Sequence, residues 1–78
     1  MTDRLRNIEV FSGPACSYCA AARKLLDKHG LSFVEIDVSQ PDGRAEFQAR
    51  LPRVRSIPQV FADGEHIGGY DDLALRLG

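Results

Sequence analysis

The sequence alternates between strand and helix patterns, and this alternation limits the folds that it can adopt. Residues 7–12 (NIEVFS) carry enough β-branched and aromatic side chains to predict a strand, which Gly13-Pro14 ends. Over residues 17–29 apolar side chains recur at helical spacing, and Gly30 follows as a C-terminal stop. Residues 33–38 (FVEIDV) predict a second strand. A strand, a helix and a strand in this order favour a right-handed crossover between parallel strands.

The second half of the chain predicts a shorter helix, a hairpin and a final helix. The short helix is expected over residues 42–51, with Asp42 as its N-cap. Its expected apolar contacts are Ala45, Phe47 and Leu51. An Asp-Gly pair joins residues 59–62 to residues 65–68, which is a strong hairpin signal. The last helix is expected over residues 71–77, since acidic residues suit a helix N-terminus.

The order βαβαββα predicts an α/β fold with a four-stranded mixed sheet flanked by three helices, which cover both faces. The 78 residues are enough for one domain, spanning 1–78, near the small end of what folds with an ordinary core. A hydrophobic fraction of 44% and a charged fraction of 27% are typical of a soluble globular protein.

Charge and hydropathy exclude several classes of partner. The formal net charge is −1, and the densest basic stretch, 50-RLPRVR-55, holds only three arginines. Nucleic acid is therefore excluded as the main partner, because such affinity depends on many phosphate contacts. The first ten residues, MTDRLRNIEV, lack the apolar segment of a secretory signal, and no apolar run approaches the roughly 20 residues that cross a bilayer. We expect a cytoplasmic protein with no membrane contact.

The two cysteines, Cys16 and Cys19, could be a structural disulfide, part of a metal site or a reactive pair. A permanent disulfide is disfavoured in a reducing cytosol, and so short a loop restrains the unfolded chain little. Structural zinc needs four ligands, and His29 and His66 lack the spacing that would complete a site. Covalent haem attachment needs a histidine where Ala20 stands. No metal site is expected.

The position of the pair favours redox chemistry. Cys16 falls between the first strand and the first helix, where free amides and the helix dipole stabilise an anion and hence the nucleophilic thiolate. Cys19 lies one turn further along, within reach for a disulfide but more shielded. A C-x-x-C placed in this way is a thioredoxin-like redox signal. We therefore predict that Cys16 and Cys19 are the catalytic residues of thiol–disulfide exchange.

Three separated segments, CSYC at 16–19, SIPQVF at 56–61 and GGYDDL at 68–73, together resemble the glutaredoxins, and the similarity runs from about Asn7 to Leu75. This resemblance implies a thioredoxin-like fold and a glutathione-disulfide oxidoreductase. Such an enzyme reduces protein disulfides and glutathione mixed disulfides, with glutathione as the reducing cosubstrate. The partners implied are glutathione and disulfide-bonded or glutathionylated proteins, and the protein is expected to be a monomer.

The resemblance also implies a set of ligand-binding residues. Ile57–Pro58 should be a cis peptide beside the reactive cysteine, leaving the Ile57 backbone free to pair with a peptide-like ligand. The helix after the Gly-Gly turn should hold the γ-glutamyl end of glutathione through its first amides and an acidic side chain. Either Asp71 or Asp72 would also be favoured there as a cap, so both roles stay open. The glutathione-binding residues implied are Tyr18, Ile57, Pro58, Tyr70, Asp71 and Asp72.

The sequence departs from the family pattern in three places. Gly13 stands where the family often has a lysine that assists the thiolate and the glycyl carboxylate, and Arg53 or Arg55 could supply that charge instead. Ser17 replaces the proline of C-P-Y-C and could cap the helix. The chain stops at Gly78, which gives a short final helix.

Two alternative functions stay open. Some relatives with the serine variant hold a [2Fe–2S] cluster between two subunits by means of glutathione, so a glutathione-ligated cluster carrier is one of them. The other is a small redoxin that depends on thioredoxin reductase. Such a redoxin would not need the Tyr70, Asp71 and Asp72 segment.

Overall fold

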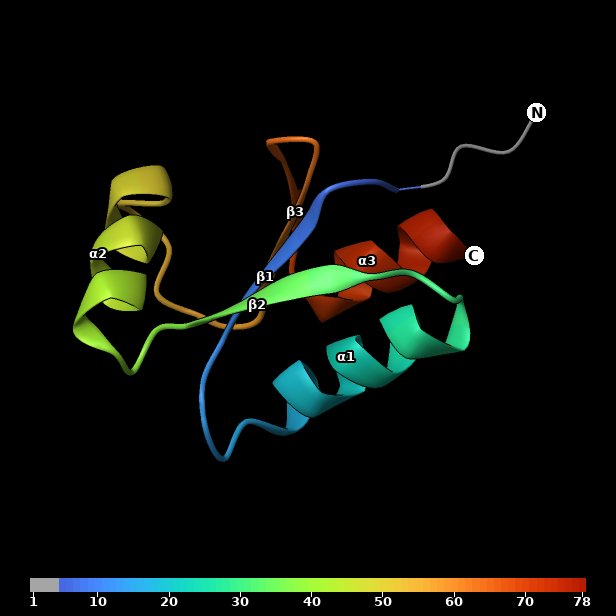
Figure 1. The fold of residues 1–78 in the computed structure, drawn as a ribbon, viewed down its shortest axis with the longest axis horizontal. Helices are drawn as coiled ribbons and strands as arrows, with labels where there is room; N and C mark the ends of the chain where they lie inside the picture. The colour runs from blue at the N-terminus through green and yellow to red at the C-terminus, as the bar shows by residue number, and fades with distance from the viewer. Residues whose placement is uncertain (1–4) are drawn as a thin grey trace.

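A computed structural model describes residues 5–78 and confirms the predicted order of elements (Figure 1). The strands and helices are β1 (Ile8–Ser12), α1 (Ser17–Lys28), β2 (Phe33–Asp37), α2 (Pro41–Arg50), β3 (Gln59–Ala62), β4 (Glu65–Gly68) and α3 (Tyr70–Leu77). No helix within residues 5–78 is both long enough and apolar enough to span a bilayer.

The four strands form one mixed sheet in the order β2-β1-β3-β4. β1 and β2 are parallel, with Ile8 opposite Phe33, and are joined through α1 as the strand–helix–strand pattern predicts. β3 runs antiparallel to both β1 and β4. The α/β fold with a mixed sheet is therefore confirmed.

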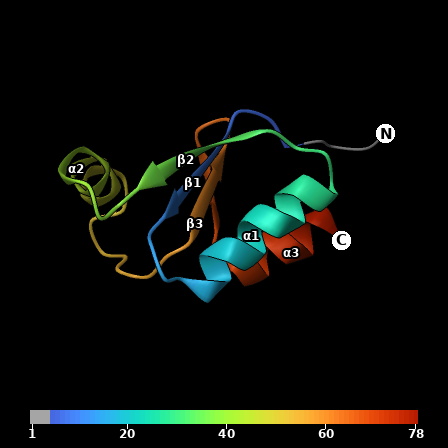
Figure 2. The ribbon, with the colours of Figure 1, turned by 60° about the horizontal axis from the view of Figure 1, so that its bottom comes forward.

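The helices divide between the two faces of the sheet. Figure 2 shows α1 and α3 side by side on one face and α2 on the other. Side chains alternate between these faces along each strand. Val10 contributes to the cluster against α1 and α3, whereas its neighbour Phe11 contributes to the cluster against α2.

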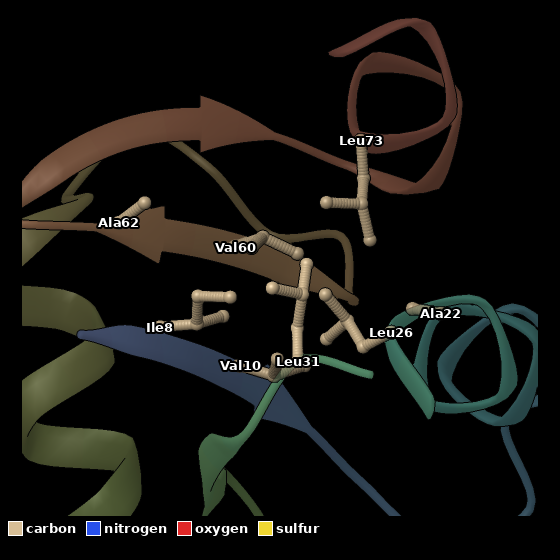
Figure 3. Close-up of a cluster of buried hydrophobic side chains, with 8 residues drawn as sticks. All are labelled: Ile8, Val10, Ala22, Leu26, Leu31, Val60, Ala62 and Leu73. Carbon is tan, nitrogen blue, oxygen red and sulfur yellow. The ribbon is translucent and has the colours of Figure 1, made fainter. Parts of the chain in front are cut away.

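The face under α1 and α3 carries the larger, aliphatic core (Figure 3). Its buried members are Ile8, Val10, Ala22, Leu26, Leu31, Val60, Ala62 and Leu73. Leu26 from α1 and Leu73 from α3 are both fully buried, so the two helices are attached to the sheet by apolar contact.

The face under α2 is aromatic. The rings of Phe47 and Phe61 lie 5.2 and 5.8 Å from that of Phe11, measured between centroids. The Arg50 guanidinium lies over Phe11 and Phe61, at 5.4 and 5.1 Å from the ring centroids, and forms a two-bond ion pair with Glu9. A charged pair therefore closes one side of this small core.

The hairpin follows from its turn residues. Asp63 and Gly64 both have positive φ, 51° and 79°, as a two-residue hairpin turn of this class requires. Asparagine, aspartate and glycine tolerate this left-handed conformation best. The predicted β3–β4 hairpin is confirmed.

Two predictions about α2 are wrong. The helix begins at Pro41 with Gln40 as its N-cap, so Asp42 lies inside the first turn, and Ala45 is exposed. A proline at the first helical position loses no hydrogen bond, because an N–H there has no partner within the helix. The helix therefore begins at Pro41, one residue before the predicted range. Gly43 instead faces the sheet, where a Cβ would overlap the carbonyl oxygen of Asp37. The close approach of α2 to the end of β2 therefore depends on this glycine.

Candidate active site

Cys16 lies at the point where the chain passes from β1 into α1. Its backbone is extended, and its Sγ accepts a hydrogen bond from the Cys19 amide at 3.2 Å. The sulfur itself is thus the N-cap of α1, and the expectation that Ser17 caps the helix is wrong. Ala15, just before it, has φ of 53°, a left-handed conformation that non-glycine residues adopt at some energetic cost. An amide already aimed at Sγ would stabilise negative charge on the sulfur.

The two cysteines are joined by a disulfide, with 5.2 Å between their Cα atoms. Cys16 is half-buried, whereas Cys19 is fully buried. The predicted difference in shielding is confirmed, and an incoming sulfur can reach only Cys16 directly.

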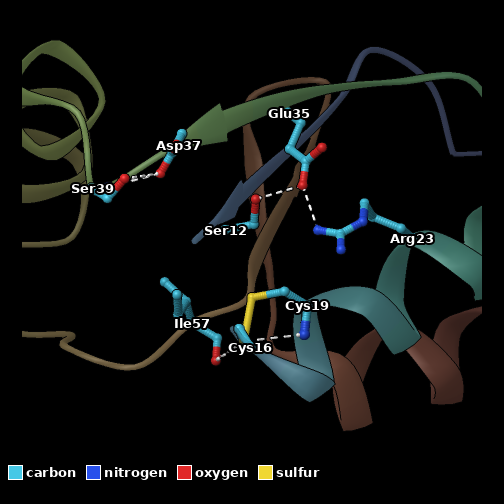
Figure 4. Close-up of polar contacts among 8 residues, drawn as sticks. All are labelled: Ser12, Cys16, Cys19, Arg23, Glu35, Asp37, Ser39 and Ile57. Atoms are coloured by element: carbon cyan, nitrogen blue, oxygen red, sulfur yellow. Dashed lines mark hydrogen bonds and ion pairs between the residues drawn. A yellow bond between two sulfur atoms is a disulfide. The ribbon is translucent and has the colours of Figure 1, made fainter. Parts of the chain in front are cut away.

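The Ile57–Pro58 peptide bond is cis, as expected. The carbonyl oxygen of Ile57 lies 3.9 Å from Cys16 Sγ, so the loop before β3 borders the reactive sulfur (Figure 4). Pro58 is buried and has no N–H to offer a ligand. The backbone of Ile57 is therefore the part of this loop that stands next to the site.

A groove of about 520 Å³ brings together all six residues predicted to bind a ligand. They come from the start of α1, the cis-proline loop and the start of α3. Tyr18 is 64% exposed, and its ring lies 5.9 Å from the Tyr70 ring, measured between centroids. The lining residues are Tyr18, Ser56, Ile57, Pro58, Gln59, His66, Gly68, Gly69, Tyr70, Asp71 and Asp72.

The two aspartates at the start of α3 differ in what they contact. The Asp72 carboxylate accepts a hydrogen bond from the Gly69 amide at 3.1 Å, which is a capping contact. Gly68 has φ of 127°, and a Cβ there would overlap the Asp72 carboxylate. The Asp71 side chain is exposed and makes no hydrogen bond or ion pair with residues 5–78. Its carboxylate is thus available to a ligand.

A chain of hydrogen bonds at one end of the groove is not predictable from the sequence. Gln59 donates its amide to the Ser56 carbonyl and hydroxyl oxygens at 3.1 and 3.2 Å, and its own amide oxygen lies 2.8 Å from His66 Nε2. His66 also stacks on Phe61, with 5.0 Å between ring centroids. From the sequence, His66 is only a member of the strand predicted over residues 65–68, and nothing local reveals that β3 and β4 place it beside Gln59.

A second polar group lies on the side of the cysteine pair away from Ile57 (Figure 4). One carboxylate oxygen of Glu35 accepts hydrogen bonds from the Ser12 hydroxyl and the Arg23 guanidinium, both at 2.6 Å. Ser12 ends β1, Glu35 lies on β2 and Arg23 on α1. The three side chains therefore tie α1 to the sheet one turn beyond Cys19.

Comparison with known proteins is consistent with this geometry. The glutaredoxin family model matches residues 8–67. Glutaredoxin 3 of Escherichia coli is 35% identical over 69 residues, which cover 88% of this chain and 83% of that protein. The chain belongs to the glutaredoxin family.

Solved structures of glutaredoxins superpose on this one. The Brucella melitensis glutaredoxin gives a TM-score of 0.72 at 42% identity and covers 91% of this chain and 77% of its own. A buckwheat glutaredoxin–glutathione complex gives 0.80 at 36% identity, over 90% and 66% of the two chains. The thioredoxin-like fold is confirmed, and Cys16 and Cys19 form the redox-active pair of a thiol oxidoreductase.

Gly13 stands where the resemblance led us to expect a lysine, and the space at this position is tight. A Cβ on Gly13 would lie 3.0 Å from Cδ1 of Ile57, closer than side chains normally approach. Of the two arginines that could supply this charge, Arg55 lines a second groove beside α2 and Arg53 lines neither groove. Within residues 5–78, no three histidine, cysteine, aspartate or glutamate side chains cluster as metal ligands would.

Proposed function

We propose that this glutaredoxin is a glutathione-dependent thiol–disulfide oxidoreductase that reduces protein disulfides and glutathione mixed disulfides through Cys16 and Cys19. The observation that carries the proposal is the groove formed by the start of α1, the cis Ile57–Pro58 loop and the start of α3. It borders Cys16, because the Ile57 carbonyl oxygen lies 3.9 Å from Cys16 Sγ. Its volume of about 520 Å³ is in the range of small-ligand sites.

In the proposed reaction with a glutathionylated target, the Cys16 thiolate attacks the glutathionyl sulfur. A disulfide forms between Cys16 and glutathione, and the target leaves as a thiolate that takes up a proton. The thiolate of a second glutathione then attacks the glutathionyl sulfur on Cys16. Glutathione disulfide leaves and Cys16 returns to the thiolate, so Cys19 takes no part in this cycle.

In the proposed reaction with a protein disulfide, Cys16 attacks one target sulfur and the other leaves as a thiolate. The Cys19 thiolate then attacks Cys16 Sγ, which releases the target's second thiol and forms the Cys16–Cys19 disulfide. Two glutathione molecules in turn reduce that disulfide. Because Cys19 is fully buried, its role is limited to displacing what Cys16 has bound.

The proposed binding mode assigns a role to each part of the groove. Free amides at the N-terminus of α3 hold the γ-glutamyl carboxylate, and the exposed Asp71 carboxylate holds its ammonium group. The Ile57 backbone pairs with the peptide, and Tyr18 packs on its side. Asp72 acts chiefly as the cap of this helix, which keeps the amides in place. Since glutathione must keep the pair reduced, we infer a cytoplasmic location. We also infer that the protein acts as a monomer, because residues of one chain line the groove.

The test is turnover of a glutathione mixed disulfide by the purified protein, with glutathione and glutathione reductase supplied. Cys16→Ser should abolish reduction of both the mixed disulfide and a protein disulfide, whereas Cys19→Ser should abolish only the second. Mixed-disulfide reduction by the Cys16→Ser variant would contradict the mechanism.

Two other outcomes would replace the proposal with its alternatives. Absence of turnover together with visible absorption in protein purified without air, lost when glutathione is removed, would indicate the [2Fe–2S] carrier. Absence of turnover with glutathione but activity with thioredoxin reductase would indicate the small redoxin.

A further inference from the structure

A second groove, of about 510 Å³, lies beside α2 and has no part in the mechanism above. It is lined by Val38, Arg44, Phe47, Gln48, Pro52, Val54 and Arg55. Four of these residues are apolar and two carry guanidinium groups, and no carboxylate is among them. We call it the α2 groove.

The arginines of the α2 groove are not neutralised by carboxylates. Arg44 donates hydrogen bonds to two backbone carbonyl oxygens, those of Val38 and Ser39, both at 3.3 Å. Arg55 is exposed and makes no hydrogen bond or ion pair with residues 5–78. By contrast, Arg23 and Arg50 each bind a glutamate. The α2 groove therefore carries uncompensated positive charge over an apolar floor.

The α2 groove lies next to the groove beside Cys16. Val38 and Ile57 both flank Gly13, with side-chain atoms 3.8 and 3.0 Å from the position that its Cβ would take. Both also pack against the aromatic core. The chain between α2 and β3 runs from α2 back to the centre of the sheet (Figure 1). Arg55 on this segment lines one groove and Ser56, the next residue, lines the other.

The two grooves have opposite charge. The groove beside Cys16 contains two aspartates and no lysine or arginine, so it offers no cationic side chain to the carboxylates of an acidic target segment. The α2 groove would attract the same peptide, because carboxylates form charge-assisted hydrogen bonds with guanidinium groups. Apolar side chains would gain from burial against Phe47, Pro52 and Val54.

We propose that the α2 groove binds an acidic, partly apolar segment of the target protein that flanks the cysteine attacked by Cys16. This proposal rests on the proposed function, in which glutathione occupies the neighbouring groove. The target segment and the glutathionyl group thus lie on opposite sides of residues 55–57, with the scissile disulfide at Cys16. Charge complementarity between the α2 groove and the target segment should chiefly raise the rate at which the target associates and the selectivity among targets.

The experiment uses two short synthetic peptides, each glutathionylated on a central cysteine. They differ only in whether Asp-Leu-Asp or Lys-Leu-Lys follows the cysteine. At low salt we expect kcat/KM for release of the peptide thiol to be about tenfold higher with the acidic peptide. The preference should shrink at high salt, where charges are screened.

Arg55→Glu is the decisive variant, because Arg55 has no contact within residues 5–78 that folding would lose. It should abolish or reverse the preference, and Arg44→Glu added to it should deepen the effect. Arg76→Glu on α3 is the matched control: it changes the net charge equally, at an exposed residue that lines neither groove. The control should keep the wild-type preference.

Three results would overturn the proposal. These are equal rates for the two peptides in the wild type, an equal loss of preference in Arg76→Glu, or a higher KM for glutathione in Arg55→Glu with the peptide preference unchanged. The last result would assign the groove to glutathione's own carboxylate.

A separate binding measurement distinguishes a failure of this proposal from a failure of the proposed function. Fluorescent versions of the two peptides with serine in place of cysteine cannot react, and their anisotropy reports binding alone. Tighter binding of the acidic peptide without turnover would support the α2 groove while the glutathione mechanism fails. Equal binding of both peptides by an active enzyme would overturn the groove and leave the mechanism intact.

Discussion

The two faces of the sheet hold different kinds of core and have different tasks. Under α1 and α3 the core is aliphatic, and both helices begin beside the groove at Cys16. Under α2 the core is three phenylalanines closed by Arg50, and neither cysteine is a member of it. The first face positions the reactive sulfur and the first amides of α3. The second face supports the sheet and carries the α2 groove.

Because of this difference, mutations on the two faces should affect the reactivity of the Cys16 thiol to different degrees. The cap of α1 is Cys16 itself, so any change that moves α1 also moves the reactive sulfur. Changes under α2 reach Cys16 only through the sheet and the cis-proline loop. Mutations on the two faces with similar effects on stability should therefore differ in their effect on thiol reactivity.

The largest expected effects come from truncating one core side chain on each face. Leu26→Ala under α1 and Phe47→Ala under α2 should each lower the free energy of unfolding by about 2–5 kcal/mol, since both remove buried apolar volume. Chemical denaturation measures both. At temperatures where both variants are folded, only Leu26→Ala should change the alkylation rate of Cys16.

Equal changes in the alkylation rate of Cys16 in the two variants would show that both faces control the reactive sulfur to the same degree, which would contradict the account. If either alanine variant does not fold, Leu26→Met and Phe47→Leu provide a milder pair for the same comparison.

Gly43→Ala should have an intermediate effect and tests how closely α2 approaches β2. In an open helix position alanine would stabilise by about 1 kcal/mol relative to glycine. Here its Cβ would overlap the Asp37 carbonyl oxygen, so we expect a net loss of about 1–3 kcal/mol in the free energy of unfolding. Ala45→Gly, at an exposed position of the same helix, is the control and should lose about 1 kcal/mol. An increase in the free energy of unfolding of Gly43→Ala would show that α2 does not lie as close to the end of β2 as in the structure.

The smallest expected effect is the pH dependence of the Glu9–Arg50 pair on the α2 face. Hydrogen bonds from Arg50 lower the pKa of the Glu9 carboxyl in the folded protein. The pair therefore stabilises the fold above the unfolded pKa of about 4.3, and this contribution is lost as the pH falls through the folded value. Glu9→Gln should cost at most about 1 kcal/mol at neutral pH.

Urea unfolding of the wild type and of Glu9→Gln across the acid range measures this contribution. The difference between the two proteins should shrink as the pH falls below the unfolded value. A difference that grows toward acid pH would contradict the assigned sign.

The features that the sequence predicts well are those encoded locally. The Asp63-Gly64 turn, the strand–helix junction at Cys16 and the strand patterns require only neighbouring residues. The cis bond before Pro58 and the residues gathered in the groove followed from the resemblance to the glutaredoxins.

The features that it misses join residues far apart in the chain. Examples are Glu35 with Ser12 and Arg23, and His66 with Gln59. These contacts depend on sheet register and helix placement, which side-chain patterns do not encode. The error at Asp42 has a local cause instead: a short helix that begins with proline allows more than one starting residue.

The most direct test of the account is the order in which the two thiols react. The reduced protein would be treated with a limiting alkylating agent across a pH series, and the labelled residue identified by mass spectrometry. We predict that Cys16 is alkylated first and remains reactive below about pH 8.5, the ordinary pKa of a free thiol, because the Cys19 amide and the helix N-terminus stabilise its thiolate. Alkylation of Cys19 first, or of both cysteines at equal rates, would contradict the assignment of Cys16 as the nucleophile.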